Sequence, residues 1–195
     1  MTPSPFIAVL AAGRARRFGA PKLDELLAGQ PVGSWVLNAV SSAGLPAGAV
    51  VTGPTPPDFL AAWPDWERLE NAAPERGLGS SLALAAQAAL QADADGLLVL
   101  LADMPLLDAT FLSKLAAAKP PAATEQMDGS PGVPALLPRA LCERLATMTG
   151  DSGAGRFLGE DPATTLIQPP ANMLIDIDRP EDLARAAALL GGNRA

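Results

Sequence analysis

Histidine and tyrosine are absent from the chain, and cysteine occurs once, at Cys142. Without histidine, a Ser-His-Asp triad, a histidine general base and a histidine-containing zinc site are excluded. A single cysteine excludes an intrachain disulfide and a cysteine-rich metal site. Chemistry is left to carboxylates, lysine, arginine, hydroxyls and backbone amides. This inventory suits phosphate chemistry with a divalent cation bound through oxygen.

Positive charge is also scarce. The 195 residues carry 14 Lys and Arg against 21 Asp and Glu, a net charge of −7. Nucleic-acid and membrane-surface binders are basic, so we expect neither partner. The first apolar run, Phe6–Ala12, is too short to span a bilayer, and no charged residue precedes it. We expect one domain, residues 1–195, in the cytoplasm.

Short continuous apolar runs alternate with segments of helical pattern, and Lys119–Pro131 has the composition of a loop. Such runs are typical of strands buried on both faces, so we predict an α/β fold with three αβα layers and a mainly parallel, mixed sheet. Asp108 is expected to cap a helix ending at Ala118, and Gly191-Gly192 to end the last helix. The predicted strands are Phe6–Ala11, Ala49–Gly53, Arg68–Asn71, Leu97–Ala102, Val133–Leu137, Thr164–Ile167 and Met173–Ile177. The other predicted helices are Pro31–Ala43, Ser80–Ala92, Arg139–Met148 and Glu181–Leu190, the last with Pro180 at its first position.

The loop after the first predicted strand concentrates the positive charge. Arg14, Arg16, Arg17 and Lys22 lie within nine positions, and no other Lys or Arg precedes Arg68. Gly13 and Gly19 allow backbone amides to approach an anion, and Arg and Lys bind phosphate. A solvated basic loop is the alternative. The spacing matches neither the P-loop nor the dinucleotide-binding fingerprint.

Carboxylates follow two other predicted strands. Asp103 comes directly after Leu97–Ala102, and Asp176 and Asp178 lie at the end of the chain's last apolar run. Ligands of α/β sheets bind at the carboxyl ends of strands, where a carboxylate can hold Mg²⁺ between phosphates. Helix capping is the alternative role for these aspartates.

These segments resemble a known family. LAAGRARRFGAPK (Leu10–Lys22) is similar to the loop L-A-A-G-x-S-x-R-M-G-x-x-K of the nucleotidyltransferases, and more narrowly of the MobA-like molybdenum cofactor cytidylyl- and guanylyltransferases. That resemblance implies a Rossmann-like nucleotide-diphospho-sugar transferase fold in which Leu10, Ala11, Ala12, Gly13, Gly19 and Lys22 bind the nucleotide. Arg17 and Lys22 would stabilise phosphate charge. Ala15 and Phe18 replace the family's Ser and Met.

Other segments extend the resemblance to Leu183. LADMP, from Leu101, and DIDRPEDL, from Asp176, resemble the family's metal-binding strings, which implies Asp103 and Asp178 as Mg²⁺ ligands with Asp176 as the alternative. Arg179 replaces a Thr there. GLGSSL, from Gly77, resembles a turn near the base and ribose, which implies nucleotide contacts at Gly79, Ser80 and Ser81; either serine can also cap the helix.

Two further segments resemble the acceptor side of the cytidylyltransferase branch. They are SPGVP, from Ser130, and GDSGAGRFL, from Gly150. They imply acceptor contacts at Gly132, Asp151 and Arg156, with Val133 in place of a His and Gly155 as an additional residue.

The resemblance implies a Mg²⁺-dependent nucleotidyltransferase. It would move a nucleoside monophosphate from an NTP to a phosphate-bearing acceptor, molybdopterin in the narrow family, and would have a molybdoenzyme or its chaperone as partner. Ala12 favours CTP over GTP. A phosphate acceptor is already mostly a dianion at neutral pH, which is compatible with the absence of histidine. The alternatives are a guanylyltransferase, a sugar-phosphate nucleotidyltransferase, a nucleotide-binding module without catalysis, and a small NAD(P)-dependent oxidoreductase.

Overall fold

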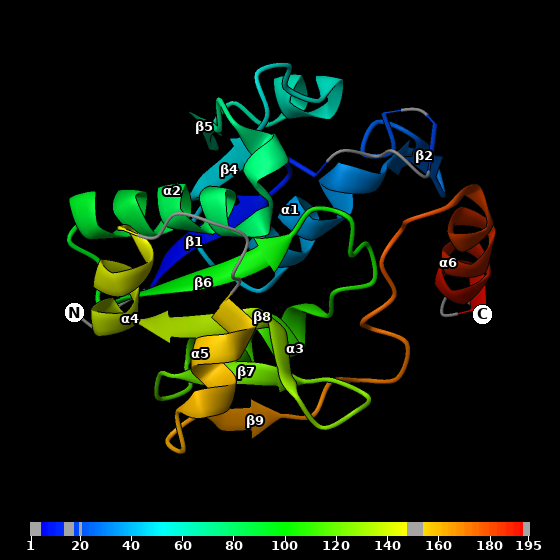
Figure 1. The fold of residues 1–195 in the computed structure, drawn as a ribbon. Helices are drawn as coiled ribbons and strands as arrows, with labels where there is room; N and C mark the ends of the chain where they lie inside the picture. Colours follow the sequence, from blue (N-terminus) through cyan, green and yellow to red (C-terminus); the bar gives the residue numbers. More distant parts are fainter. Residues whose placement is uncertain (1–4, 14–17, 20, 148–153, 193–195) are drawn as a thin grey trace.

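The computed structural model describes residues 5–13, 18–19, 21–147 and 154–192, and its centre is a mixed sheet (Figure 1). The sheet has seven strands in the order β5-β4-β1-β6-β8-β7-β9. They are β1 (Phe6–Leu10), β4 (Ala49–Thr52), β5 (Glu67–Glu70), β6 (Gly96–Leu101), β7 (Ala122–Glu125), β8 (Pro131–Pro138) and β9 (Thr165–Ile167). β8 is antiparallel to β6 and β7, and the other neighbouring pairs are parallel. Every strand except β8 therefore ends at the same edge of the sheet.

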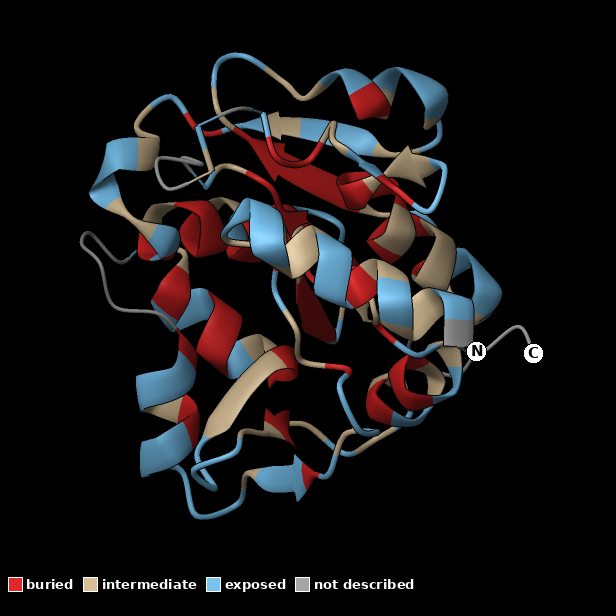
Figure 2. Ribbon diagram, turned by 90° about the vertical axis from the view of Figure 1, so that its right-hand side faces the viewer, coloured by how far each residue is buried: buried red, intermediate tan, exposed pale blue. Residues whose placement is uncertain are grey.

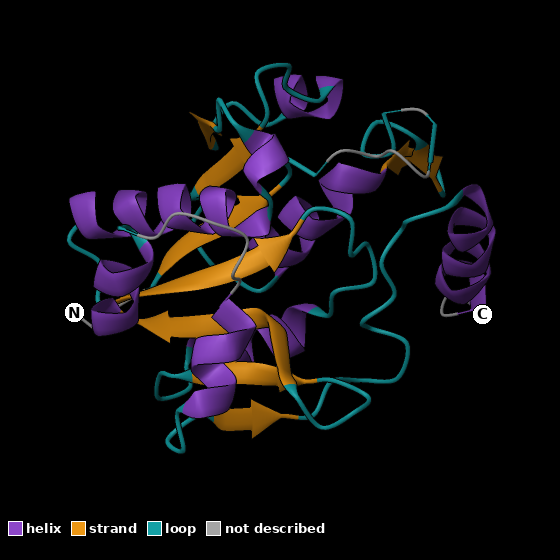
Figure 3. Cartoon of the chain, viewed as in Figure 1, coloured by secondary structure: helices purple, strands orange, loops and turns teal. Residues whose placement is uncertain are grey.

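Helices cover both faces of this sheet, which confirms the predicted three-layer α/β class (Figures 1 and 3). One face carries α1 (Val32–Ser42) and α3 (Ala109–Ala116), and the other carries α2 (Leu78–Gln91), α4 (Arg139–Leu145) and α5 (Ala154–Glu160). α6 (Pro180–Gly192) contacts β2 of a small hairpin, β2 (Leu26–Leu27) and β3 (Gln30–Pro31). Two short 3-10 turns, η1 (Asp58–Ala62) and η2 (Pro74–Arg76), complete the described elements.

The central strands β1 and β6 are apolar throughout because each contributes to two cores. In β1, Ile7 and Val9 pack into the cluster beneath α1 and α3, whereas Ala8 and Leu10 pack into the cluster beneath α2. Successive side chains of a strand point to opposite faces, so a strand covered on both sides needs apolar residues at every position. Figure 2 shows the resulting distribution, with buried strands between helices whose outer faces are exposed.

Two predicted elements are wrong. The segment Lys119–Pro131, predicted as a loop, contains β7, which pairs with both β8 and β9. The predicted strand Met173–Ile177 is not a strand. Its apolar side chains Met173 and Ile177 are buried in the core beneath α1 and α3 without joining the sheet. A continuous apolar run requires burial, and burial does not by itself require strand pairing.

The start of α2 and the end of α6 also differ from the prediction. α2 begins at Leu78 with Gly77 before it, at φ 88°, so neither Ser80 nor Ser81 is its N-cap. α6 continues through Gly191 and Gly192 instead of ending before them. The cap at Asp108 is confirmed, because its carboxylate accepts a hydrogen bond from the N–H of Phe111. None of the helices in the described ranges is both long and apolar enough to cross a bilayer.

Candidate functional site

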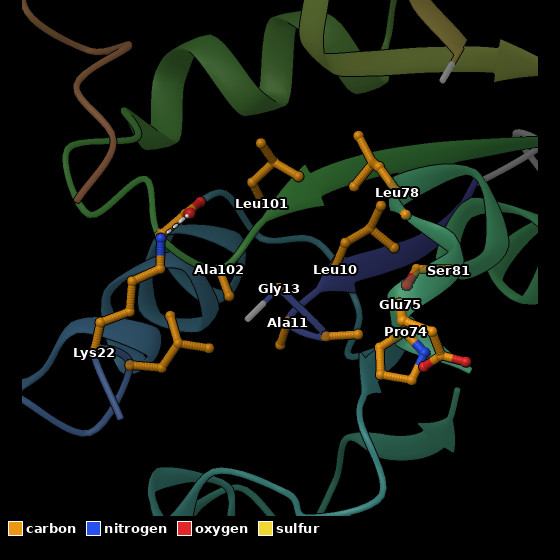
Figure 4. A pocket seen from close by; sticks show the side chains of 14 residues that line it. Leu10, Ala11, Gly13, Lys22, Pro74, Glu75, Leu78, Ser81, Leu101 and Ala102 are labelled. Carbon is orange, nitrogen blue, oxygen red and sulfur yellow. Dashed lines mark hydrogen bonds and ion pairs between the residues drawn. The ribbon is translucent and has the colours of Figure 1, made fainter. Parts of the chain in front are cut away.

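A cleft of about 680 Å³ opens beyond the carboxyl ends of β1 and β6 (Figure 4). Lys22 and Asp103 lie at one end of it, and Pro74, Glu75 and Ser81 lie at the other. The cleft is lined by Leu10, Ala11, Ala12, Gly13, Lys22, Leu23, Pro74, Glu75, Gly77, Leu78, Ser81, Leu101, Ala102 and Asp103. This is the position at which α/β sheets bind ligands, and the volume suits a nucleotide-sized molecule.

Three residues predicted from separate parts of the sequence meet at one end of the cleft. The Lys22 ammonium lies 2.7 Å from Oδ2 of Asp103 and 3.2 Å from Oδ1 of Asp178. The Lys22 side chain is 10% exposed, whereas those of Asp103 and Asp178 are 23% and 46% exposed. The cluster is therefore closed on the lysine side and open to solvent on the carboxylate side.

The charges of this cluster perturb one another. Burial by itself lowers the pKa of Lys22, but Asp103 and then Asp178 outweigh it, and the net pKa is raised. Partial burial raises the pKa of the nearby Asp176 carboxyl, and the charges of Asp178 and Asp103 raise it further. Lys22 is accordingly a firmly charged cation between two carboxylates, with a third carboxyl close by.

The turn that carries Asp178 is fixed to the sheet and to α6. The N–H of Ile177 donates to the carbonyl of Asp103 over 2.9 Å, which joins this turn to the end of β6. The carboxylate of Asp182 accepts hydrogen bonds from the N–H groups of Asp178 and Arg179. Backbone contacts therefore bring Asp178 to Asp103 from a distant part of the chain.

Sequence reasoning missed the residue that shapes the opposite wall, Asn71. It is 3% exposed, and its amide donates to Oγ of Ser80 over 2.8 Å and to Oγ of Ser81 over 3.0 Å. Its carbonyl oxygen accepts from the N–H of Ala73. Asn71 thus joins the end of β5 to the start of α2. Its place directly after a strand at the carboxyl edge was the signal that could have identified it.

The predicted nucleotide-binding residues are not all in this cleft. Gly19 lies in an adjoining hollow, which shares Gly13 and Lys22 with the cleft and extends toward the proline-rich segment 53–58. Gly79 and Ser80 lie in the first turn of α2 but do not line the cleft, whereas Ser81 does. Arg17 and Asp151 lie outside the described residues.

A further hollow of about 640 Å³ lies on the same edge of the sheet, beyond β7 and β9. Its lining includes Gln126, Asn172 and Asp176. Gly132 borders it indirectly, because a Cβ at Gly132 would collide with the side chain of Gln126. Arg156 lines neither hollow; its exposed side chain forms an ion pair with Glu160 over 2.9 Å on α5. Of Gly132 and Arg156, the two predicted acceptor residues that the structure describes, only Gly132 lies near a cavity at this edge.

The carboxylates fit a divalent cation that is shared with a substrate. Asp103 and Asp178 both contact a single cation, the Lys22 ammonium, so their oxygens already converge on one positive charge. Within the described ranges, no group of three His, Cys, Asp or Glu side chains forms a complete protein-only metal site. Mg²⁺ usually takes one or two carboxylates and completes its shell with water and substrate phosphates, so this pair suffices.

A mixed sheet with a charged cleft at its carboxyl edge defines the class of nucleotide-binding α/β proteins. A family model described as the MobA-like NTP transferase domain matches residues 7–165, and the chain belongs to that family. The purine catabolism protein PucB of Bacillus subtilis is 30% identical over 204 residues, covering 94% of this chain and 98% of PucB.

Solved structures support the same fold. A nucleotidyl transferase from Methanothermobacter thermautotrophicus superposes with a TM-score of 0.81 at 21% identity, covering 97% of this chain and 99% of that one. Molybdopterin-guanine dinucleotide biosynthesis protein A from Archaeoglobus fulgidus superposes with a TM-score of 0.64 at 17% identity, covering 95% and 98%. The family model confirms the predicted nucleotidyltransferase class, and these solved structures confirm its fold.

Proposed function

We propose that this nucleotidyltransferase moves CMP from CTP to a phosphate-bearing acceptor, molybdopterin being the first candidate, with Mg²⁺ as cofactor. The observation that carries the proposal is the convergence of Lys22, Asp103 and Asp178 at the nucleotide cleft. An oxygen of the acceptor phosphate attacks the α-phosphorus, the bond to the bridging oxygen of the β-phosphate breaks, and pyrophosphate leaves. Alignment and charge neutralisation supply most of the catalysis in such a transfer.

Each residue of the cluster has a distinct task in this proposal. Asp103 and Asp178 would hold Mg²⁺, which supplies neutralisation of phosphate charge when bound. Lys22 would donate hydrogen bonds to the phosphates. Its side chain is held in place by burial and by its ion pairs with Asp103 and Asp178. The space beside Gly13 and Gly19 is open: among the described residues, no atom lies within 4 Å of where a Cβ at either position would be. A phosphate could therefore approach the backbone amides there. The proposal that Arg17 stabilises the charge of the phosphates rests on the motif alone.

The acceptor would lie in the hollow beyond β7 and β9, on the other side of Asp176 from the nucleotide. No general base is required, because the second pKa of a phosphate monoester is about 6 and its oxygen is therefore already deprotonated at neutral pH. The A. fulgidus neighbour is named for molybdopterin-guanine dinucleotide biosynthesis, which makes molybdopterin the first acceptor to test. A molybdoenzyme or its chaperone would then receive the product.

The test is product identification. Purified protein is incubated with Mg²⁺, one NTP at a time, and either molybdopterin or a sugar phosphate as acceptor. Pyrophosphate and the nucleotide-containing product are measured. The proposal expects the fastest release with CTP and a product carrying CMP. Faster turnover with GTP would mean that GTP, and not CTP, is the nucleotide substrate. Turnover only with a sugar phosphate would mean that the acceptor is a sugar phosphate and not molybdopterin. Nucleotide binding without pyrophosphate release with either acceptor would identify a binding module without catalysis, which the Ala15, Val133 and Gly155 departures would explain.

A further inference from the structure

The first turn of α6 is tied to the metal-binding aspartate assigned above. We propose that Asp182 is a positioning residue, which holds the turn of Asp178 so that its carboxylate faces Asp103. This inference rests on the proposed function, because it concerns the second carboxylate assigned to the metal. Asp182 lies in the DIDRPEDL string, but the resemblance assigns a role only to Asp178 and Asp176 there. In the contacts described above, Asp182 touches neither Lys22 nor Asp103.

Two hydrogen bonds carry the inference. Oδ2 of Asp182 accepts from the N–H of Asp178 over 3.0 Å and from the N–H of Arg179 over 2.7 Å. On the other side of Asp178, the N–H of Ile177 donates to the carbonyl of Asp103. The backbone of Asp178 is therefore held from both sides, by the end of β6 and by α6.

The pattern is one half of a capping box. In the full motif, the side chain of a Ser or Thr at the N-cap accepts a hydrogen bond from the backbone N–H of the residue three positions later. The side chain of that later residue in turn accepts a hydrogen bond from the backbone N–H of the N-cap residue. Arg179 occupies the N-cap place, and an arginine side chain has no hydrogen-bond acceptor. The side chain of Asp182 therefore supplies the returning bond without the reciprocal one.

The carboxylate of Asp178 needs such support. It is 46% exposed and contacts Lys22 at 3.2 Å, the longer of the two lysine contacts. An exposed side chain is positioned by the backbone that carries it more than by packing. Residues that orient metal ligands in this indirect way typically change metal affinity by ten- to a hundredfold when they are removed.

Four variants separate positioning from charge and from helix stability. Asp182→Ala removes both hydrogen bonds. Asp182→Asn removes the negative charge but retains an acceptor oxygen. Glu181→Ala removes an exposed carboxylate from the same first turn, so it matches the loss of charge near the N-terminus of α6. Arg179→Thr provides the missing half of the box.

The experiment measures the coupling between Mn²⁺ and CTP. Calorimetry gives the Kd of CTP with Mn²⁺ and with EDTA, and the ratio is the factor by which the metal tightens the nucleotide. We expect Asp182→Ala to reduce that factor about tenfold. Asp182→Asn and Glu181→Ala should stay within about threefold of the wild type, and Arg179→Thr should equal or exceed it. Hydrogen exchange at the amides of Asp178 and Arg179 should quicken in Asp182→Ala only.

An unchanged factor in Asp182→Ala would overturn the inference, and so would an equal loss in Glu181→Ala. A loss in Asp182→Asn as large as in Asp182→Ala would also overturn it, because charge rather than position would then be responsible. A wild-type protein that binds CTP without any effect of Mn²⁺ would overturn the metal assignment of the proposed function, and the inference with it. The two failures are thus distinguishable.

Discussion

The ammonium group of Lys22 lies 2.7 Å from the carboxylate of Asp103, 81 residues further along the chain. Lys22 ends the basic loop after β1, and Asp103 follows β6, the strand paired with β1 in parallel. Parallel pairing places both strand ends at one edge, so this contact follows from topology as well as from charge. It places a cation beside the carboxylate that we propose as a metal ligand, at one end of the cleft.

Removal of the lysine should weaken nucleotide binding. Lys22→Met keeps the apolar stem and removes the cation, and we expect the Kd of CTP measured by calorimetry to rise at least tenfold. The matched control is Lys114→Met, because Lys114 is exposed on α3, far from the cleft lining. Equal CTP affinity in Lys22→Met and the wild type would exclude Lys22 from phosphate binding.

Removal of the first carboxylate should abolish metal-dependent turnover without unfolding the protein. Asp103→Ala eliminates a proposed metal ligand, and we expect Mg²⁺-dependent pyrophosphate release to fall by at least about a hundredfold. The exposed Asp178 remains beside Lys22, so the lysine keeps an ion-pair partner, and circular dichroism should show the native helix content. A wild-type rate in Asp103→Ala would remove Asp103 from the metal site.

The close approach of two strands depends on a glycine. A Cβ at Gly48 would collide with the backbone carbonyl of Ile7, at the start of the β1–β4 pairing. Gly48→Ala should therefore lower the free energy of unfolding by about 1–3 kcal/mol, the usual range for overpacking. Gly191→Ala is the control, because a Cβ there meets no atom of the described residues within 4 Å and alanine favours a helix. Urea unfolding of both variants checks the difference, and equal stability would contradict the packing.

The single thiol should be unreactive in the folded protein. Cys142 is 1% exposed, and burial raises its pKa to about 11. The thiol is therefore protonated at pH 8, and iodoacetamide should label it only after unfolding. Rapid labelling of the native protein at pH 8 would contradict this burial.

The same pKa predicts how stability changes with pH. Between pH 9 and 11 the unfolded chain releases the Cys142 proton while the folded chain keeps it, so this residue lowers stability as pH rises. The melting temperature of the wild type should fall more steeply over this interval than that of Cys142→Ala. Parallel curves for the two proteins would show that Cys142 does not contribute.

The strands that are covered on both faces of the sheet could be predicted from the sequence. β1 and β6 are continuous apolar runs and were predicted within one residue at each end. The hairpin β2–β3 was missed because its turn places Ala28 at φ 49° beside Gly29 at φ 91°. Alanine is uncommon in that conformation, so no turn signal was present. β7 was missed because it is short and follows Pro120 and Pro121.

The part of the site that could be predicted from the sequence consists of residues whose charge identifies them as candidates. Lys22, Asp103 and Asp178 each carry charge at the end of a loop or strand, and all three meet. Asn71 and Asp182 were missed because their roles are hydrogen bonds to backbone and serine groups that only the folded chain brings together. Arg156 was assigned to the acceptor side by its motif, whereas its described partner is Glu160.

The central claim is that the cleft between Lys22, Asp103 and Ser81 binds a metal–NTP complex. Thermal unfolding of the wild type with CTP, GTP, ATP or UTP, each with Mg²⁺ and with EDTA, tests it most directly. A ligand that binds only the folded state raises the melting temperature, and the rise grows with the logarithm of its concentration relative to its Kd. The account predicts a clear rise with CTP and Mg²⁺, larger than with the other nucleotides and reduced by EDTA. An unchanged melting temperature with all four nucleotides at millimolar concentration would contradict it.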